Sequence, residues 1–154
     1  MTGNEAFVLA EIDAADTGPL RGRVLRPGSP AAATVFLGDD HPQVVHLAAR
    51  VGGPDGPIIA VGTIFPDGAP WAAGRPDSWR IRGMATDPAW RGRGAGRLVL
   101  DGLLDSARAG AGTLVWCHAR VGAWGFYRRA GFTAVGAVFH DGIADHQSMV
   151  RPLP

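Results

Sequence analysis

A turn rich in glycine and arginine, residues 91–96, carries the clearest chemical signal in the sequence. It reads Arg-Gly-Arg-Gly-Ala-Gly and leads into a helical pattern. Glycines lack a Cβ, so the backbone of such a turn can approach a ligand closely, and the first N–H groups of a helix have no intrahelical partner. These amides, the helix dipole and the charges of Arg91, Arg93 and Arg97 together favour an anion. The sequence therefore predicts an anion site, and its positive charge favours a diphosphate over a single carboxylate.

Two common phosphate sites do not fit this turn. A P-loop needs a lysine and an adjoining Ser or Thr, and all 15 basic residues of the chain are arginines. A dinucleotide-binding turn reads G-x-G-x-x-G, with an acidic residue about 20 positions later. Here the glycines stand at 92, 94 and 96, and the next strand-like run, 113–119, has no carboxylate. The sequence thus excludes a P-loop and fits dinucleotide binding poorly.

The elements that position the turn follow from the spacing of apolar residues. Residues 79–84, before the turn, alternate as a strand does. One face of this strand would carry Trp79, Ile81 and Gly83, and the other Arg80, Arg82 and Met84. After the turn, residues 94–109 predict a helix, because apolar residues recur at steps of three and four and Gly110 is a natural stop. The buried stripe of this helix would consist of Leu100, Leu103, Leu104 and Ala107.

The rest of the chain predicts further strands, helices and loops around this unit. Strands are expected at residues 7–12, 44–51, 58–65, 113–119, 132–139 and 147–153. Helices are expected at 121–130 and within 13–26, the latter interrupted by Gly18-Pro19. Loops are expected at 27–42, 66–76 and 140–146.

Length and composition narrow the class of protein. The 154 residues predict a single domain, 1–154, and a net charge of +1 gives no field that would attract nucleic acid or a membrane. The chain has neither an 18-residue apolar run nor a basic-then-apolar leader, so we expect a cytoplasmic protein. Neither paired cysteines nor an i, i+4 histidine pair occurs, so no metal site is expected. The one cysteine, Cys117, is interpreted as a small buried hydrophobe.

Two segments resemble the motifs of the GNAT superfamily of N-acetyltransferases. Arg91, Gly94 and Gly96 open a helix and follow a strand and Asp87-Pro88, and they are similar to the R/Q-x-x-G-x-G/A motif for acetyl-CoA. Residues 123–132, AWGFYRRAGF, resemble the second segment, N-x-x-A-x-x-F-Y-x-x-x-G-F. The two motifs stand in the order of the family, and the resemblance covers about residues 79–132.

The resemblance implies a fold and a reaction. The fold would be the α/β (α+β) GNAT fold of a small, single-domain bacterial type. Its sheet would be mixed, mostly antiparallel, with six to seven strands splayed in the middle, flanked by about four helices. The reaction would be direct transfer of acetyl from acetyl-CoA, a co-substrate, to an amine in a ternary complex without a metal.

The resemblance also assigns residues to the coenzyme. Pantetheine would lie along Met84, Ala85 and Thr86, and the diphosphate would be held by Arg91, Gly92, Arg93, Gly94, Ala95, Gly96 and Arg97. Tyr127 stands where the hydroxyl of the family protonates the leaving thiolate; the alternative is that its ring only packs against the sheet. Arg120 is a departure, since it occupies the coenzyme-side position where the family usually has Asn. This departure keeps open a second interpretation, a catalytically weak or inactive acyl-CoA-binding or sensing module.

Removal of the amine proton is the larger chemical problem. An alkylamine of pKa about 10.4 is neutral in roughly one molecule in 2,500 at pH 7, a handicap of about 4.6 kcal/mol. A histidine could take this proton through a water. We rank His146 first and His118 second, and His46, Asp39 and Asp40 are the other candidates. Each histidine could equally be an ordinary polar residue, and a desolvating pocket could need no dedicated base.

The motifs describe the donor side, so the acceptor stays open. A small metabolite amine, an aminoglycoside-like drug, a peptide N-terminus and a protein lysine all fit. The predicted loops 27–42, 66–76 and 140–146 would decide among them. Homodimers are common among such domains, but no apolar stripe in the sequence identifies an interface.

Overall fold

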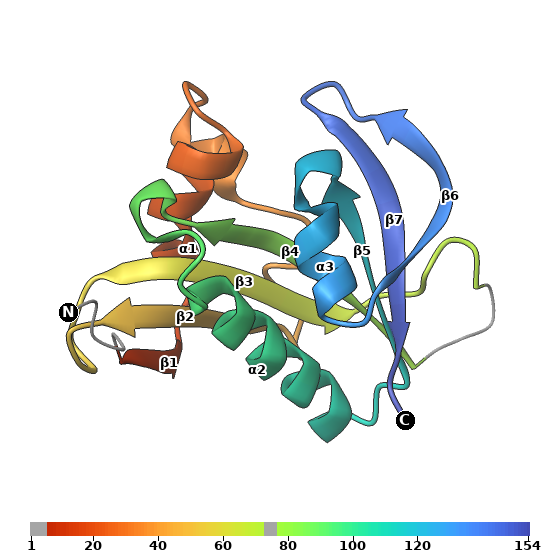
Figure 1. The fold of residues 1–154 in the computed structure, drawn as a ribbon, viewed down its shortest axis with the longest axis horizontal. Helices are drawn as coiled ribbons and strands as arrows, with labels where there is room; N and C mark the ends of the chain where they lie inside the picture. The colour runs from red at the N-terminus through yellow and green to blue at the C-terminus, as the bar shows by residue number, and fades with distance from the viewer. Residues whose placement is uncertain (1–5, 73–76) are drawn as a thin grey trace.

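The protein is built on a seven-stranded sheet whose strands lie in the order β1-β2-β3-β4-β5-β7-β6 (Figure 1). The computed structural model describes residues 6–72 and 77–154. The strands are β1 (Phe7–Glu11), β2 (Val45–Val51), β3 (Ile58–Pro66), β4 (Ser78–Thr86), β5 (Leu114–Arg120), β6 (Thr133–His140) and β7 (Asp145–Pro152). The α-helices are α1 (Ala14–Leu20), α2 (Ala95–Ala109) and α3 (Trp124–Arg129). Short helices of other kinds are η1 (Arg21–Leu25), η2 (Ala31–Thr34), η3 (Pro88–Trp90) and η4 (Val121–Ala123). The predicted fold class is confirmed, although the described residues hold three α-helices where about four were expected.

The sheet divides in its middle, between β4 and β5. These two neighbours are parallel, whereas all other neighbours are antiparallel. Their pairing covers only Ser78–Arg80 against Leu114–Trp116. Beyond that point β4 runs on to Thr86 and β5 to Arg120 without pairing to each other, so the predicted splay is present.

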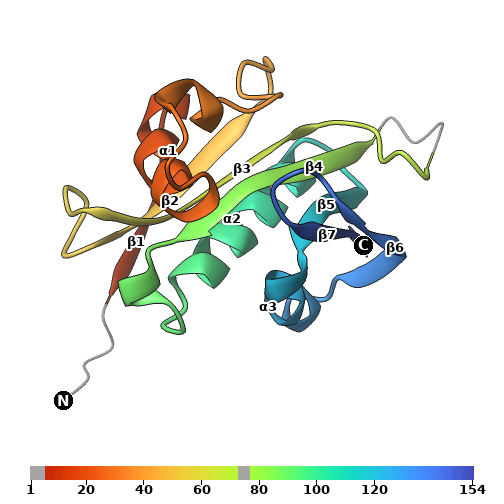
Figure 2. The same cartoon turned by 90° about the horizontal axis from the view of Figure 1, so that it is seen from above.

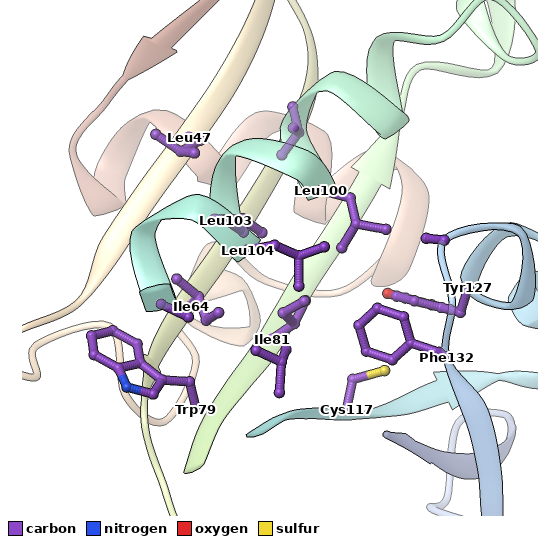
Figure 3. Close-up of a cluster of buried hydrophobic side chains, with 14 of the residues drawn as sticks. Leu47, Ile64, Trp79, Ile81, Leu100, Leu103, Leu104, Cys117, Tyr127 and Phe132 are labelled. Atoms are coloured by element: carbon purple, nitrogen blue, oxygen red, sulfur yellow. The ribbon is translucent and has the colours of Figure 1, made fainter. Parts of the chain in front are cut away.

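The two faces of the sheet are covered by different helices. Figure 2 shows α1 on one side of β2 and β3 and α2 on the other. The α2 side holds the main core, in which Leu100, Leu103 and Leu104 are at most 1% exposed (Figure 3). Trp79 and Ile81 of β4 join this core. The helix predicted at 94–109 and its buried stripe are therefore confirmed.

The predicted alternation of β4 is wrong at its last two positions. A β-bulge interrupts the β3–β4 register between Val61 and Thr63, and Gly83 takes a φ of +66°. The bulge adds one residue, so Met84 turns back onto the α2 side, beside the core. Gly83 instead faces Arg21 on the opposite side. The one sign in the sequence was Gly83 itself, because a glycine inside a strand pattern suggests a bulge.

The expected interruption at Gly18-Pro19 is also absent. Pro19 lies inside α1, and the helix passes directly into η1, a π-helix. The N–H of Arg26 donates to the carbonyl of Arg21, 3.0 Å away, five residues back. The chain thus stays helical through Pro19 and widens into a π-helix directly after it. The last four residues of the predicted loop 66–76 lie outside the described residues.

None of the helices that the structure describes is both long enough and apolar enough to cross a bilayer.

Candidate active site

A cavity of about 1030 Å³ opens where β4 and β5 separate. Its walls come from β4, β5, the start of α2, α3, η1 and the turn before β7. The lining includes these predicted site residues: Met84, Ala85, Thr86, Arg91, Gly92, Gly94, Ala95, Gly96, Arg97, His118, Arg120, Tyr127 and His146. Segments more than 100 residues apart in sequence thus meet at one place. Of the residues assigned to the coenzyme, Arg93 alone is not in the lining; its guanidinium lies over the ring of Trp90, 4.9 Å from the centroid.

One end of the cavity is the start of α2. Gly94, the N-cap, has a φ of +93°, which favours glycine over other residues. The first helical bond runs from the N–H of Leu98 to the carbonyl of Gly94 (3.0 Å), so the amides of residues 95–97 precede the helical ladder. No acidic side chain lies in the first turn of α2 to compete with a bound anion. The geometry suits an anion with several oxygens.

The end of β4 lies against this helix start. A Cβ on Gly96 would come within 2.9 Å of the Thr86 hydroxyl, so glycine allows helix and strand to approach. Pairing of β4 with β5 ends at Arg80, and the stretch Met84 to Thr86 pairs only with β3 among the described strands. Its other edge therefore presents backbone hydrogen-bonding groups to the cavity.

Tyr127 lines the cavity from the α2 side. Its side chain packs with Phe126 and Phe132 and is only 5% exposed (Figure 3). Burial and the neighbouring Cys117 thiol raise the pKa of Tyr127 well above 10. The same burial raises the pKa of the Cys117 thiol to about 12. Both groups therefore keep their protons at neutral pH, which makes the phenol a possible proton donor and the thiol a poor nucleophile.

His118 lies on the opposite face of the sheet. Residues that face each other in antiparallel strands share a face, and His118 pairs with Ser148, whereas Cys117 pairs with the core residue Met149. The Nδ1 of His118 is 2.9 Å from the Ser148 hydroxyl. Burial first, and then the charge of Arg80 and other cations, lower the pKa of His118, so its imidazole is neutral at pH 7.

His146 lies on the same face, opposite Arg120 in the register. Its Nδ1 is 2.9 Å from the carbonyl of Ala144, and a carbonyl can only accept, so Nδ1 carries the hydrogen. Nε2 is then the ring nitrogen that can accept a proton. The ring stacks on Phe139, and Asp141 Oδ2 lies 3.5 Å from Nδ1. This orientation by a carbonyl and a carboxylate is the support that a general base needs.

The other base candidates lie elsewhere. His46 and Asp39 belong to a buried network, in which His46 Nδ1 is 2.7 Å from the Thr63 hydroxyl and Asp39 pairs with Arg21. Neither they nor Asp40 line the cavity. Their contacts favour a structural role.

Arg120 also lies on the side away from α2. Its guanidinium donates to the carbonyl of Leu25 at the end of η1, 2.7 Å away. Burial and the charge of Arg26 lower the pKa of Arg120. The residue that replaces the usual Asn thus joins β5 to η1.

Sequence reasoning missed part of the lining. Arg26, Phe36, Arg80 and Arg82 also face the cavity. Arg26 and Phe36 belong to segments that only the tertiary fold brings to β4. The alternation that placed Arg80 and Arg82 together on one face of a strand was the one available signal.

Comparison with known proteins agrees with this geometry. Residues 20–132 match the model of the acetyltransferase (GNAT) family. The uncharacterized N-acetyltransferase YitI of Bacillus subtilis (strain 168) is 28% identical over 143 residues, which cover 92% of this chain and 93% of that protein.

Solved structures share the fold. A GCN5-related N-acetyltransferase from Kribbella flavida superposes with a TM-score of 0.72 at 19% identity, over 96% of this chain and 98% of that one. A chain of the NatC complex bound to Gag peptide and CoA gives a TM-score of 0.74 at 17% identity, over 96% of this chain and 99% of that one.

Proposed function

The chain belongs to the acetyltransferase (GNAT) family, and from this premise we propose that it moves an acetyl group from acetyl-CoA to an amine by direct attack in a ternary complex. Residues from Val24 to His146 contribute to one cavity, which supports a single catalytic domain over 1–154. The observation that carries the proposal is the meeting of three features in this cavity: the open start of α2, the free edge of β4 and the buried Tyr127.

The coenzyme would lie along these features. The amides of residues 95–97, with Arg91 and Arg97, would hold its diphosphate, and the edge of β4 from Met84 to Thr86 would hold its pantetheine. The NatC complex, which has a similar fold, is bound to CoA, and this supports the choice of donor.

The two proton transfers would occur on opposite sides of the splayed sheet. His146, or else His118, would take a proton from the ammonium on the side of α1. The amine nitrogen would then attack the thioester carbon, the C–S bond would break, and Tyr127 would give its proton to the sulfur from the side of α2. The second proton of the attacking nitrogen leaves to solvent as the intermediate collapses, the histidine releases the proton that it took, and Tyr127 regains one from solvent. Acetyl-CoA plus ammonium thus gives amide, free thiol and one proton. The raised pKa keeps Tyr127 protonated at neutral pH, so its proton is available, although it also makes the phenol a weaker acid.

A free-thiol release assay with a panel of amines tests this proposal. Tyr127→Phe keeps the ring and removes the proton, so we expect turnover to fall by about 10²–10⁴ while calorimetry finds unchanged binding of acetyl-CoA. Undiminished turnover in this variant would remove Tyr127 from the mechanism.

Cys117→Ala is the matched control, because it removes the thiol beside the phenol. Direct transfer predicts that this variant retains turnover, and its complete loss would indicate an acyl-cysteine route instead. Acetyl-CoA binding without turnover of any amine would favour the non-catalytic binding module. An absence of heat with acetyl-CoA would contradict both functions.

A further inference from the structure

Positive charge accumulates in the cavity beyond what the coenzyme site explains. The charged residues of the lining are seven arginines and one acid: Arg26, Arg80, Arg82, Arg91, Arg97, Arg120, Arg129 and Asp141. Arg91, Arg97 and Arg129 lie around the start of α2; Arg97, for example, donates to the carbonyl of Arg129, 3.2 Å away. The other four arginines belong to β4, β5 and the end of η1, and the chain as a whole has a net charge of only +1. The acceptor side is therefore locally cationic.

These four arginines lie on the side of the sheet away from α2. Arg80 pairs with Trp116 in the register and lies over its ring, at 4.8 Å from the centroid. Arg80 and Arg82 alternate with Ile81, which is in the core under α2. His118 and His146 share this side. A group bound by these arginines would therefore belong to the acceptor and not to the diphosphate.

Most of the buried arginines near this place already have partners. Arg21 is fully buried and donates to both oxygens of Asp39, at 2.6 and 3.0 Å. Arg80 lies 3.5 Å from Asp67 Oδ2, and Arg120 donates to the carbonyl of Leu25. Arg21 and Arg80 thus each have a carboxylate.

Arg82 differs from them. Within the described residues, its one hydrogen bond is a long contact of 3.4 Å to the carbonyl of Leu37, and no carboxylate lies within ion-pair distance of it. Burial, followed by the charges of Arg80, Arg21 and Arg26, lowers the pKa of Arg82 to about 10. The guanidinium thus faces the cavity in an environment that disfavours its charge, and a bound anion would relieve this cost.

Phe36 holds two of the cations in place without neutralising them. The guanidinium carbons of Arg26 and Arg82 are each 5.1 Å from its ring centroid. Cation–π contact orients the planar groups but adds no negative charge. A guanidinium group can donate paired hydrogen bonds to the oxygens of a carboxylate or phosphate.

We propose that the amine acceptor carries an oxyanion, a carboxylate or a phosphate, and that Arg82 binds it together with Arg26. This inference rests on the proposed function and names its substrate class: small amines with an anionic group, such as amino acids or amino-phosphates. Anchoring of the oxyanion at Arg82 directs the amine toward His118 and His146, which lie on the same side. Arg82 is then a specificity-determining residue.

Pairs of amines that differ only in the anion test the proposal. Amino acids are compared with their carboxamides, and phosphoethanolamine with ethanolamine, by thiol release at saturating acetyl-CoA. The α-amine of a carboxamide is less basic than that of the amino acid, so a larger fraction of it is unprotonated at pH 7. This difference alone would favour the carboxamide, and it therefore works against the expected preference for the amino acid. We expect kcat/KM to favour the anionic member of one pair by about 10- to 100-fold, the range of a hydrogen bond to a charged group. A preference in the carboxylate pair identifies an amino acid, and one in the phosphate pair a phosphorylated amine.

Arg82→Gln should remove most of this preference by lowering kcat/KM for the anionic amine by about 10- to 100-fold, and it should leave the affinity for acetyl-CoA unchanged. Arg50→Gln is the matched control, because Arg50 is also a half-buried arginine on a strand but lies outside the cavity. Equal kcat/KM for both members of both pairs would overturn the proposal while leaving acetyl transfer intact.

Calorimetry separates this outcome from failure of the proposed function. If no amine turns over, acetyl transfer is contradicted, and binding of the same amines to the CoA-loaded protein still tests the anion site. Tighter binding of the anionic member, abolished in Arg82→Gln, supports the site. Equal binding of both members overturns it.

Discussion

Arg21 and Asp39 form an ion pair inside the protein: Arg21 Nη1 lies 2.6 Å from Asp39 Oδ2, and the two side chains are 0% and 8% exposed. Arg21 also donates to the carbonyl of Thr34 and the hydroxyl of Thr63. The pair therefore ties η1 to the loop before β2 and to β3. Because η1 contributes Arg26 and its neighbours to the cavity, this buried contact supports the acceptor side of the site.

Loss of Asp39 should destabilise the whole fold. Asp39→Ala leaves the Arg21 guanidinium buried without a counter-charge, and we expect a loss of about 3–5 kcal/mol in the free energy of unfolding. Urea denaturation measures this loss. Asp40→Ala, at the exposed neighbouring position, is the control and should change stability by less than about 0.5 kcal/mol. Similar effects of the two substitutions would contradict the importance of the ion pair.

The same pair predicts the response to acid. Burial raises the pKa of Asp39, but hydrogen bonds from Arg21 and the Phe36 amide outweigh it, so the pKa lies below its ordinary value of 3.8. A lowered carboxyl pKa stabilises the fold above pH 3.8, and this stabilisation is lost as the pH falls further. Asp39→Ala should therefore show a smaller loss of stability than wild type between pH 4 and pH 2.

Gly83→Ala tests the bulge in β4. At a φ of +66°, its Cβ would lie 2.8 Å from Arg21 Nε, so both backbone strain and a clash oppose the substitution. Gly28→Ala is the matched control, because Gly28 has a φ of +76° with no atom near the new Cβ. We expect Gly28→Ala to cost about 1 kcal/mol, and Gly83→Ala to cost at least ~1 kcal/mol more. Equal urea unfolding midpoints for the two variants would show that the Arg21 side chain moves away from the new Cβ at little cost.

Arg91→Ala tests the coenzyme end of the cavity. Loss of this proposed charged donor to the diphosphate should raise the Kd for acetyl-CoA by about 10- to 100-fold in calorimetry, with the difference shrinking at high salt. Arg108→Ala, at the far end of α2 and outside the cavity, should leave the Kd unchanged. A Kd that is insensitive to Arg91 would move the diphosphate away from this turn.

Absorbance can follow Tyr127 directly, because it is the only tyrosine in the chain. Its raised pKa predicts no phenolate signal from the folded protein at pH 10, where a free phenol is half ionised. Above about pH 10 the folded state retains the Tyr127 proton and the unfolded state loses it. The contribution of Tyr127 to the free energy of unfolding should therefore be fully present below about pH 10 and decline as the pH rises further. A phenolate signal that develops with a midpoint near pH 10 in the folded protein would show that the phenol is accessible.

Histidine variants identify the base. We expect His146→Gln to lower kcat by about 10²–10⁴ and His118→Gln to lower it less. His140→Gln is the control: His140 is close to His146 in sequence, but its side chain is 60% exposed and outside the cavity lining. If His118 is the base, its lowered pKa predicts that kcat decreases on the acidic side with a midpoint below pH 6.5. Unchanged kcat in both variants would mean that neither histidine is needed.

The structural features that could best be predicted are those set by residues close together in the sequence. The buried stripe of α2 repeats along one helix, and the turn from Arg91 to Gly96 is a single local segment, so both could be predicted without the fold. The approach of Tyr127 to the same cavity followed from a family resemblance and a known order of elements.

What depends on tertiary contacts could not be predicted. The bulge at Gly83 reverses the side of Met84, and Gly83 there faces Arg21 of another element. His46 and Asp39 were candidate bases from the sequence, because their contacts are made only in the folded protein: His46 contacts Thr63, and Asp39 pairs with Arg21. The cationic acceptor side likewise forms only when the end of η1 and Phe36 meet Arg82.

The narrow joint between β4 and β5 has a mechanical consequence. Three residue pairs, Ser78–Arg80 against Leu114–Trp116, connect two otherwise complete smaller sheets. A molecule bound between them would stiffen the sheet here, because its own amides would form the backbone hydrogen bonds that β4 and β5 do not make with each other beyond these pairs. The protein with this molecule bound should then bend less between β4 and β5 than the empty protein. The sheet would become flexible again each time the bound molecule leaves.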